Sequence, residues 1–186
     1  MADSNVTKKA MALALKELSC KKLFEKISIG DICRHCNMSR KTFYYHFKDK
    51  EDLVNWIFDT EFIAYARKNT YMSVWDAMKD LLEYFYRNRD FYKKILFHEG
   101  QNSFAVYFNE LIYTVFVEQL QTILQNPSAK ASQINFVADG MVCMLKRWLT
   151  ASECTPPDIF IDEIKSGAKI MAAYIIRTLP EDQKAI

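Results

Sequence analysis

Basic, hydroxyl and aromatic side chains dominate residues 39–50 of this 186-residue chain. An arginine such as Arg40 can form two parallel hydrogen bonds with a guanine in a DNA major groove, and Lys41 and Thr42 can reach bases or phosphates. Tyrosine hydroxyl and histidine N–H groups can donate to phosphates, which fixes docking without reading sequence. The chemistry this run could perform is therefore nucleic-acid binding. The side chains that we expect at such an interface are Ser28, Ser39, Arg40, Lys41, Thr42, Tyr44, Tyr45, His46 and Lys50.

Three of these assignments have alternatives. Tyr44 could belong to the core, because it lies three residues before Phe47. His46 could be a surface residue without a role. Arg40 is exposed under any reading of this segment, and it contacts either a base or a phosphate.

Two short helices and a tight turn would position this run. Ser28, with Asp31 three residues on, resembles a capping box and predicts the start of a short helix that ends near Cys36. Asn37 tolerates the left-handed backbone of a helix-ending turn, and Ser39 is a good N-cap for the next helix. This is the pattern of a helix-turn-helix. The apolar side chains expected to hold its helices together are Ile32, Met38, Phe43, Phe47 and Leu53.

The run Ser28-x-x-x-Ile-Cys-x-x-Cys-Asn-Met-Ser-x-x-Thr-Phe-Tyr-x-His-Phe-x-x-Lys-x-x-Leu53 resembles the N-terminal domain of the tetracycline-repressor family of bacterial regulators. The resemblance covers about residues 6–60. Two cysteines replace the family's alanines and Asn37 replaces its turn glycine, and all three are small enough to keep the turn. The resemblance implies a DNA-binding head and, further along the chain, helices around a small-molecule cavity. A weaker resemblance is to the branch that includes activators of dihydroxyacetone-kinase operons, where a partner protein can bind the metabolite instead.

Cys33 and Cys36 form a Cys-x-x-Cys pair, which can be a redox pair or half of a zinc site. No second Cys/His pair stands at zinc-finger spacing, so small core packing is the better reading, and we expect no metal and no cofactor. The chain also has no phosphate-binding glycine loop, His-Glu-x-x-His motif or nucleophile elbow, which argues against an enzyme.

The charge is divided unevenly along the chain, although the net charge is only +2. Residues 1–53 hold 11 Lys and Arg against 7 Asp and Glu, whereas residues 54–186 hold 14 against 16. A basic first part fits a polyanion partner, although chance could give the same division. No signal peptide or long uncharged apolar stretch is evident, and the five cysteines lack a disulfide spacing. We therefore expect a cytoplasmic protein with reduced thiols.

Long apolar periodic stretches and few glycines predict an all-α fold of about nine helices. We expect a helix-turn-helix domain over residues 1–53 and a helical regulatory and dimerisation domain over residues 54–186. Aromatic side chains of the second domain could line a ligand pocket, although ordinary core packing is the alternative. The residues proposed for that pocket are Trp56, Trp75, Phe85, Phe91, Phe97 and Tyr107.

The last two helices suit self-association. Val137, Met141 and Leu145 share one face of the first, and Ala168, Met171 and Ile175 share one face of the second. Two such helices from each of two subunits would form a four-helix bundle, and the alternative is packing within one chain. A two-fold pair predicts a palindromic operator. Taken together, these features predict a homodimeric transcriptional regulator that responds to a small molecule or a partner protein. The alternative is a ligand- or partner-binding protein whose head no longer binds DNA.

Overall fold

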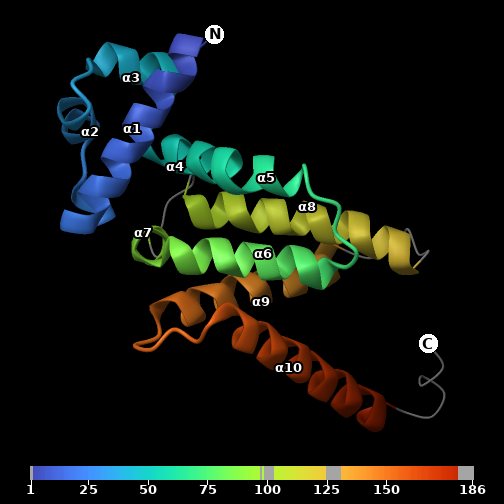
Figure 1. Cartoon of the computed structure of the whole chain (residues 1–186). Coiled ribbons are helices and arrows are strands. Elements are labelled where there is room, and N and C mark those ends of the chain that lie inside the picture. The colour runs from blue at the N-terminus through green and yellow to red at the C-terminus, as the bar shows by residue number, and fades with distance from the viewer. Residues whose placement is uncertain (1, 97, 99–102, 125–130, 180–186) are drawn as a thin grey trace.

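The computed structural model describes residues 2–96, 98, 103–124 and 131–179, and all regular structure in these ranges is helical (Figure 1). Helices α4, η2 and α5 run on without a break over residues 50–66. Counted as one, they bring the total in the described ranges to nine, apart from the short 3₁₀ turn η1. The predicted all-α fold is confirmed.

Three helices and a short turn make up the first part of the chain, which we call the head. They are α1 (Ala2–Lys21), η1 (Phe24–Lys26), α2 (Ile29–His35) and α3 (Arg40–His46), coloured blue in Figure 1. The apolar side chains that the sequence predicted to hold this part together, Ile32, Phe43, Phe47 and Leu53, are no more than 3% exposed. Met38 packs partly buried against them, and the core that they form continues into the rest of the chain.

Helix α1 buries one side against three other helices. Met11, Ala14, Leu15 and Leu18 are no more than 9% exposed, whereas Leu13 is 59% exposed. The helix contacts α2, α4 (Lys50–Phe58) and α7 (Arg89–Ile95).

One long helix leads from the head into the rest of the chain, which we call the body. It comprises α4 (Lys50–Phe58), the π-helical turn η2 (Asp59–Ile63) and α5 (Ala64–Ala66). Asp49 caps its start by accepting a hydrogen bond from the Asp52 amide. A π turn inside an α-helix is rare and widens the helix locally.

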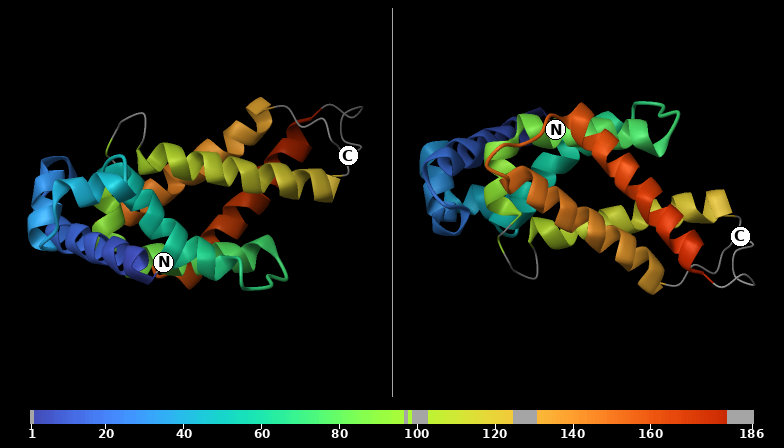
Figure 2. Two further views of the ribbon diagram at one scale, coloured as in Figure 1. Left: turned by 90° about the horizontal axis from the view of Figure 1, so that it is seen from above. Right: turned by 90° about the horizontal axis from the view of Figure 1, so that it is seen from below.

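The body comprises this long helix together with α6 (Val74–Arg87), α7 (Arg89–Ile95), α8 (Phe104–Leu124), α9 (Ala131–Thr150) and α10 (Pro157–Thr178). Helix α8 contacts both α4 and α9, and α10 contacts α6. Phe58 lies at the centre of an aromatic cluster and stacks on Phe85, with 5.6 Å between ring centroids. Around them lie Tyr84, Tyr92, Phe104 and Phe108. Figure 2 shows α8 and α9 on one side of α6 and α10 crossing beneath it.

Helix α10 is packed along its first turns and exposed along the rest. The Phe160 ring stacks on Trp148 at 4.7 Å, and Ile161 is buried. From residue 166 to residue 178 every side chain is exposed, and in Figure 1 this half of α10 lies apart from the other helices. Among the described residues, no helix has the length and apolar character needed to cross a membrane.

Candidate nucleic-acid interface

Local chemistry fixes the turn between α2 and α3. The Ser28 hydroxyl accepts from the Asp31 amide while the Asp31 carboxylate accepts from the Ser28 amide, so the predicted capping box is present. Asn37 has a φ of 54°, which is the left-handed backbone that its residue type tolerates. The Met38 amide then donates to the Cys33 carbonyl at 2.8 Å. These bonds hold the start of α3 at a fixed angle to α2.

Helix α3 buries one face and offers the other to solvent. Phe43 is fully buried, whereas Tyr44 and Tyr45 are 52% and 82% exposed. Arg40 and Lys41 at its first turn are also exposed. A short helix with two cations at its N-terminus and two tyrosines on its outer face can enter a DNA groove and contact its walls.

Ser39 and Thr42 stabilise the start of α3. The Ser39 hydroxyl accepts from the Thr42 amide at 3.0 Å, which confirms Ser39 as the N-cap. It also shares a hydrogen bond with the Thr42 hydroxyl at 2.8 Å. His46, half-buried at the other end of α3, contacts the Tyr45 ring edge-on. The exposed face of α3 is therefore held in one conformation by its own side chains.

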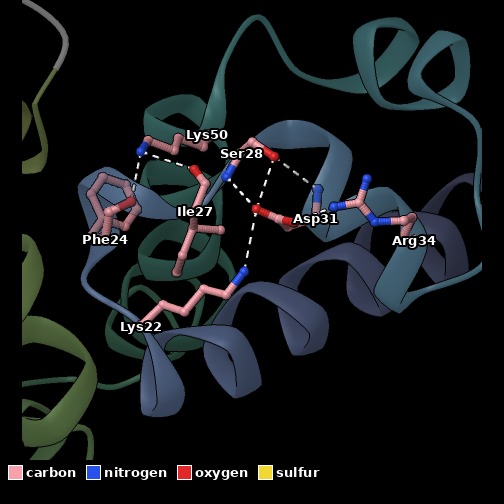
Figure 3. Close-up of polar contacts among 7 residues, drawn as sticks. All are labelled: Lys22, Phe24, Ile27, Ser28, Asp31, Arg34 and Lys50. Carbon is pink, nitrogen blue, oxygen red and sulfur yellow. Dashed lines mark hydrogen bonds and ion pairs between the residues drawn. The ribbon is translucent and has the colours of Figure 1, made fainter.

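Lys50 faces inward rather than toward a phosphate (Figure 3). Its ammonium group donates to the carbonyls of Phe24 and Ile27, at 2.7 and 3.1 Å, and lies 4.4 Å from the centre of the Phe24 ring. Burial lowers the pKa of this ammonium. The phosphate contact expected from the sequence is replaced by a structural role, because the ammonium group is bonded to two backbone carbonyls of the head.

The Asp31 carboxylate organises the start of α2. It accepts from both the amide and the hydroxyl of Ser28, and these bonds lower its pKa to about 2. Lys22 and Arg34 lie on either side of it as ion-pair partners (Figure 3). Ser28 remains exposed at the head surface, but its hydroxyl is already engaged in the cap.

Long-range polar contacts that sequence reasoning missed join the head to the body. Lys16 of α1 pairs with Glu61 of the π turn at 2.6 Å, and Lys94 of α7 donates to the Ser19 carbonyl. The partners are 45 and 75 residues apart. No local pattern signals such pairs, because each residue alone resembles a solvated charge.

The body contains an apolar cavity of about 170 Å³ between the long helix, α6 and α8. None of the aromatic residues proposed for a ligand pocket lines it. Trp56 packs edge-on against Phe47, Phe85 belongs to the aromatic core, and the Tyr107 hydroxyl donates to Asp59. Three others complete the set: Trp75 lies beneath Lys165, Phe91 is buried beside Tyr92, and Phe97 falls outside the described residues.

The proposed dimerisation residues divide between the two helices. On α9, Leu145 is only 4% exposed and packs inside the chain, Met141 lines the cavity, and Val137 is half-buried. On α10, Ala168 and Met171 are exposed, and so is Ile175 at 46%. The apolar stripe of α9 therefore packs largely within its own chain, which was the alternative to self-association. The apolar face that remains exposed belongs to α10.

The cysteines show no sign of a metal centre. Cys33 is buried and the Cys36 thiol, half-buried, donates to the Ile32 carbonyl. Burial raises the pKa of both thiols. Within the described ranges, no group of three or more His, Cys, Asp or Glu side chains is placed to hold a metal ion.

Two regions of the chain match known protein families. Residues 16–57 match the family described as "Bacterial regulatory proteins, tetR family", and residues 73–169 match the TetR "Transcriptional regulator C-terminal region". The second match alone spans more than half of the chain. The chain belongs to the TetR family. It is thus a DNA-binding transcriptional regulator with a helix-turn-helix head, and not an enzyme.

One curated relative of this TetR-family chain is the "HTH-type dhaKLM operon transcriptional activator DhaS" of Lactococcus lactis. The two are 30% identical over 122 residues, which are 64% of this chain and 65% of the relative. The match thus spans just under two thirds of that relative's length.

Two solved structures have the same fold. A structure titled "Dihydroxyacetone kinase operon activator DhaS" has a TM-score of 0.62 at 21% identity, over 91% of this chain and 96% of that one. A TetR transcriptional regulator from Streptococcus agalactiae has a TM-score of 0.66 at 19% identity, over 87% and 93%.

Proposed function

We propose that the protein binds a palindromic operator as a homodimer, through the exposed face of α3, and that an effector bound in the body changes its affinity for the operator. The observation that carries the proposal is the outer face of α3, where Arg40, Lys41 and Tyr45 are exposed on a helix fixed by two caps and a buried Phe43.

The interface residues divide by role. Arg40, Lys41 and Thr42, in the first turn of α3, are placed to read bases or to contact the phosphates beside them. Tyr44 and Tyr45 are placed to donate to phosphates. We propose Ser28, Ser39 and His46 as further contacts to the DNA backbone. Lys50 is left out, since two carbonyls occupy its ammonium group.

The exposed half of α10 supports pairing with a second copy. Ile170, Met171 and Tyr174 are 68%, 56% and 65% exposed on consecutive turns, and Ile175 and Ile176 continue the same apolar surface. So many large apolar side chains on one unpacked helix are costly in water and typical of a subunit interface. Two-fold pairing would place two copies of α3 about one DNA turn apart.

The long helix over residues 50–66 supports a response to an effector. It starts directly after α3 and ends at the wall of the apolar cavity. A shift at the cavity end would therefore move the recognition helices relative to one another, and the fixed spacing of the two half-sites turns a change in angle into a change in affinity. A partner protein acting on the body could bias the same helix.

Selection from a random-sequence DNA library, followed by fluorescence anisotropy on the enriched duplex, tests the proposal. We expect a palindrome whose half-site centres lie about one turn apart, and an affinity that falls steeply with added salt. No retention of DNA even at low salt would favour the alternative, a ligand- or partner-binding protein with a vestigial head.

A further inference from the structure

The apolar cavity has walls from four helices, namely the long helix over residues 50–66, α6, α8 and α9. Phe62 comes from the π turn, Ala66 from α5, Ala77 and Met78 from α6, Phe108 from α8 and Met141 from α9. The cavity holds about 170 Å³. This cavity is partly open to the surface. Its volume is similar to that of an enclosed apolar cavity of roughly 150 Å³ that takes up benzene in another protein, so it has room for a substituted benzene ring.

The chemistry of the walls is uniform. Every residue that lines the cavity is aliphatic, aromatic or methionine, so no lining side chain is charged or carries a hydroxyl or an amide. Most of the lining backbone lies inside helices, where its amide and carbonyl groups are paired with one another. A ligand hydroxyl or amine would lose its hydrogen bonds to water here and gain none, which costs roughly tenfold to a hundredfold in affinity for each group.

We propose that this cavity binds a small uncharged apolar molecule of about the size of a substituted benzene, and that polyols, phosphates and amines are excluded from it. The inference rests on the proposed function, because it names the chemical class of the effector. It also separates the cavity from the polar sites of the body. The Tyr84 and Tyr92 hydroxyls, for example, are bonded to each other outside its lining.

The cavity has a direct route to the head. The π turn contributes Phe62 and Ile63 to the wall, while Glu61 of the same turn forms the ion pair with Lys16 of α1. A molecule that displaces Phe62 would therefore also displace the adjacent Glu61, whose ion pair with Lys16 connects the π turn to the head. π turns inside α-helices occur frequently at functional sites.

Toluene and phenol are a matched pair of probes for the full-length protein, because they differ by a methyl group against a hydroxyl. We expect titration calorimetry to show toluene binding, with phenol at least tenfold weaker and glycerol without measurable binding. Equal or tighter binding of phenol, or no binding of toluene, would overturn the proposal.

Substitutions on α5 place the probe in this cavity. Ala66→Leu fills the space and should weaken toluene binding at least tenfold, whereas Ala64→Leu, on the exposed side of the same helix, should leave it unchanged. Ala77→Leu fills the cavity from α6 and replaces Ala66→Leu if that variant does not fold. Toluene affinity that is unchanged in a folded cavity-filling variant would refute the assignment.

Operator binding, measured on the same samples, separates this inference from the proposed function. Toluene binding by a protein that retains no DNA would uphold the apolar site and overturn the regulatory role. DNA binding without toluene uptake would overturn the apolar site and leave the DNA-binding function intact.

Discussion

Lys16 of α1 and Glu61 of the π turn form an ion pair with 2.6 Å between Nζ and Oε2, which joins the DNA-binding head to the wall of the apolar cavity. Glu61 also accepts a hydrogen bond from the Tyr84 hydroxyl at 3.0 Å. One carboxylate thus touches the head, the long helix and α6, so its position reports on all three.

Glu61→Gln should uncouple the cavity from the operator. The two side chains are 24% and 38% exposed, so the pair contributes less than about 1 kcal/mol to the free energy of unfolding. We expect toluene to change the operator affinity of the wild type at least fivefold and that of the variant less than twofold, measured by anisotropy. Arg87→Gln, which breaks the Glu83–Arg87 pair on α6, is the control and should keep the full effect. A full toluene effect in Glu61→Gln would exclude this pair as the link.

Ser28→Ala should weaken both the fold and operator binding. Loss of an N-cap costs about 1 kcal/mol, and the start of α2 supports the turn before α3. Ser73→Ala removes the equivalent capping box of α6 and should cost similar stability with unchanged operator affinity. Urea unfolding and anisotropy measure the two effects. Equal operator affinity in both variants would show that the α2 cap does not position the interface.

The capping box also predicts a pH dependence. The pKa of Asp31 is lowered to about 2 in the folded protein, so its stabilising effect is present above its ordinary pKa of about 3.9 and is lost as the pH falls toward 2. We therefore expect the difference in urea midpoint between wild type and Asp31→Asn to be constant from pH 7 to 5 and to narrow below about pH 4. A difference that grows as the pH falls would contradict the assignment.

The variants Lys50→Met and Lys41→Met should distinguish a lysine that stabilises the fold from a lysine that contacts a DNA phosphate. Lys50→Met removes the ammonium donor from the Phe24 and Ile27 carbonyls, of which the Phe24 carbonyl keeps its bond from the Ile27 amide. It should lower the free energy of unfolding by about 1–3 kcal/mol, with the salt dependence of operator binding unchanged. Lys41→Met should leave stability unchanged and reduce the slope of log affinity against log salt by about one. Unchanged stability and a reduced salt slope in Lys50→Met would instead indicate that Lys50 contacts a DNA phosphate.

Met171→Glu should prevent pairing through α10. A carboxylate in the centre of an apolar interface is costly to bury, so we expect a monomer by analytical ultracentrifugation and the loss of cooperative operator binding. Met72→Glu, at a loop residue that is 96% exposed, is the control and should stay dimeric. A dimeric Met171→Glu would place the subunit interface elsewhere.

Local chemistry made the head predictable. The caps at Ser28 and Ser39 and the left-handed Asn37 each depend on groups within three residues, so the sequence alone predicts them, and the structure confirms all three. The inward contacts of Lys50 could not be predicted in this way, because its carbonyl partners are 26 and 23 residues distant.

The helices of the body could be predicted from the sequence, but the position of its cavity could not. Aromatic residues such as Phe85 attracted the pocket prediction, yet large rings fill the core, and the cavity lies where smaller side chains such as Ala66 and Ala77 meet. Its walls come from four helices, and no spacing within one helix reveals where the four meet. The stripe on α9 was correctly read as apolar, but periodicity cannot say whether such a stripe faces its own chain, as Leu145 does, or another.

We propose that α3 binds DNA through its first turn, and the Arg40→Ala variant tests this binding most directly. On the duplex enriched by selection, we expect this variant to lose about 1–3 kcal/mol of operator affinity and to discriminate less at one base pair of each half-site. Arg147→Ala, at an exposed position of α9, should bind as the wild type does. Operator affinity and base preference that are unchanged in Arg40→Ala would contradict the account.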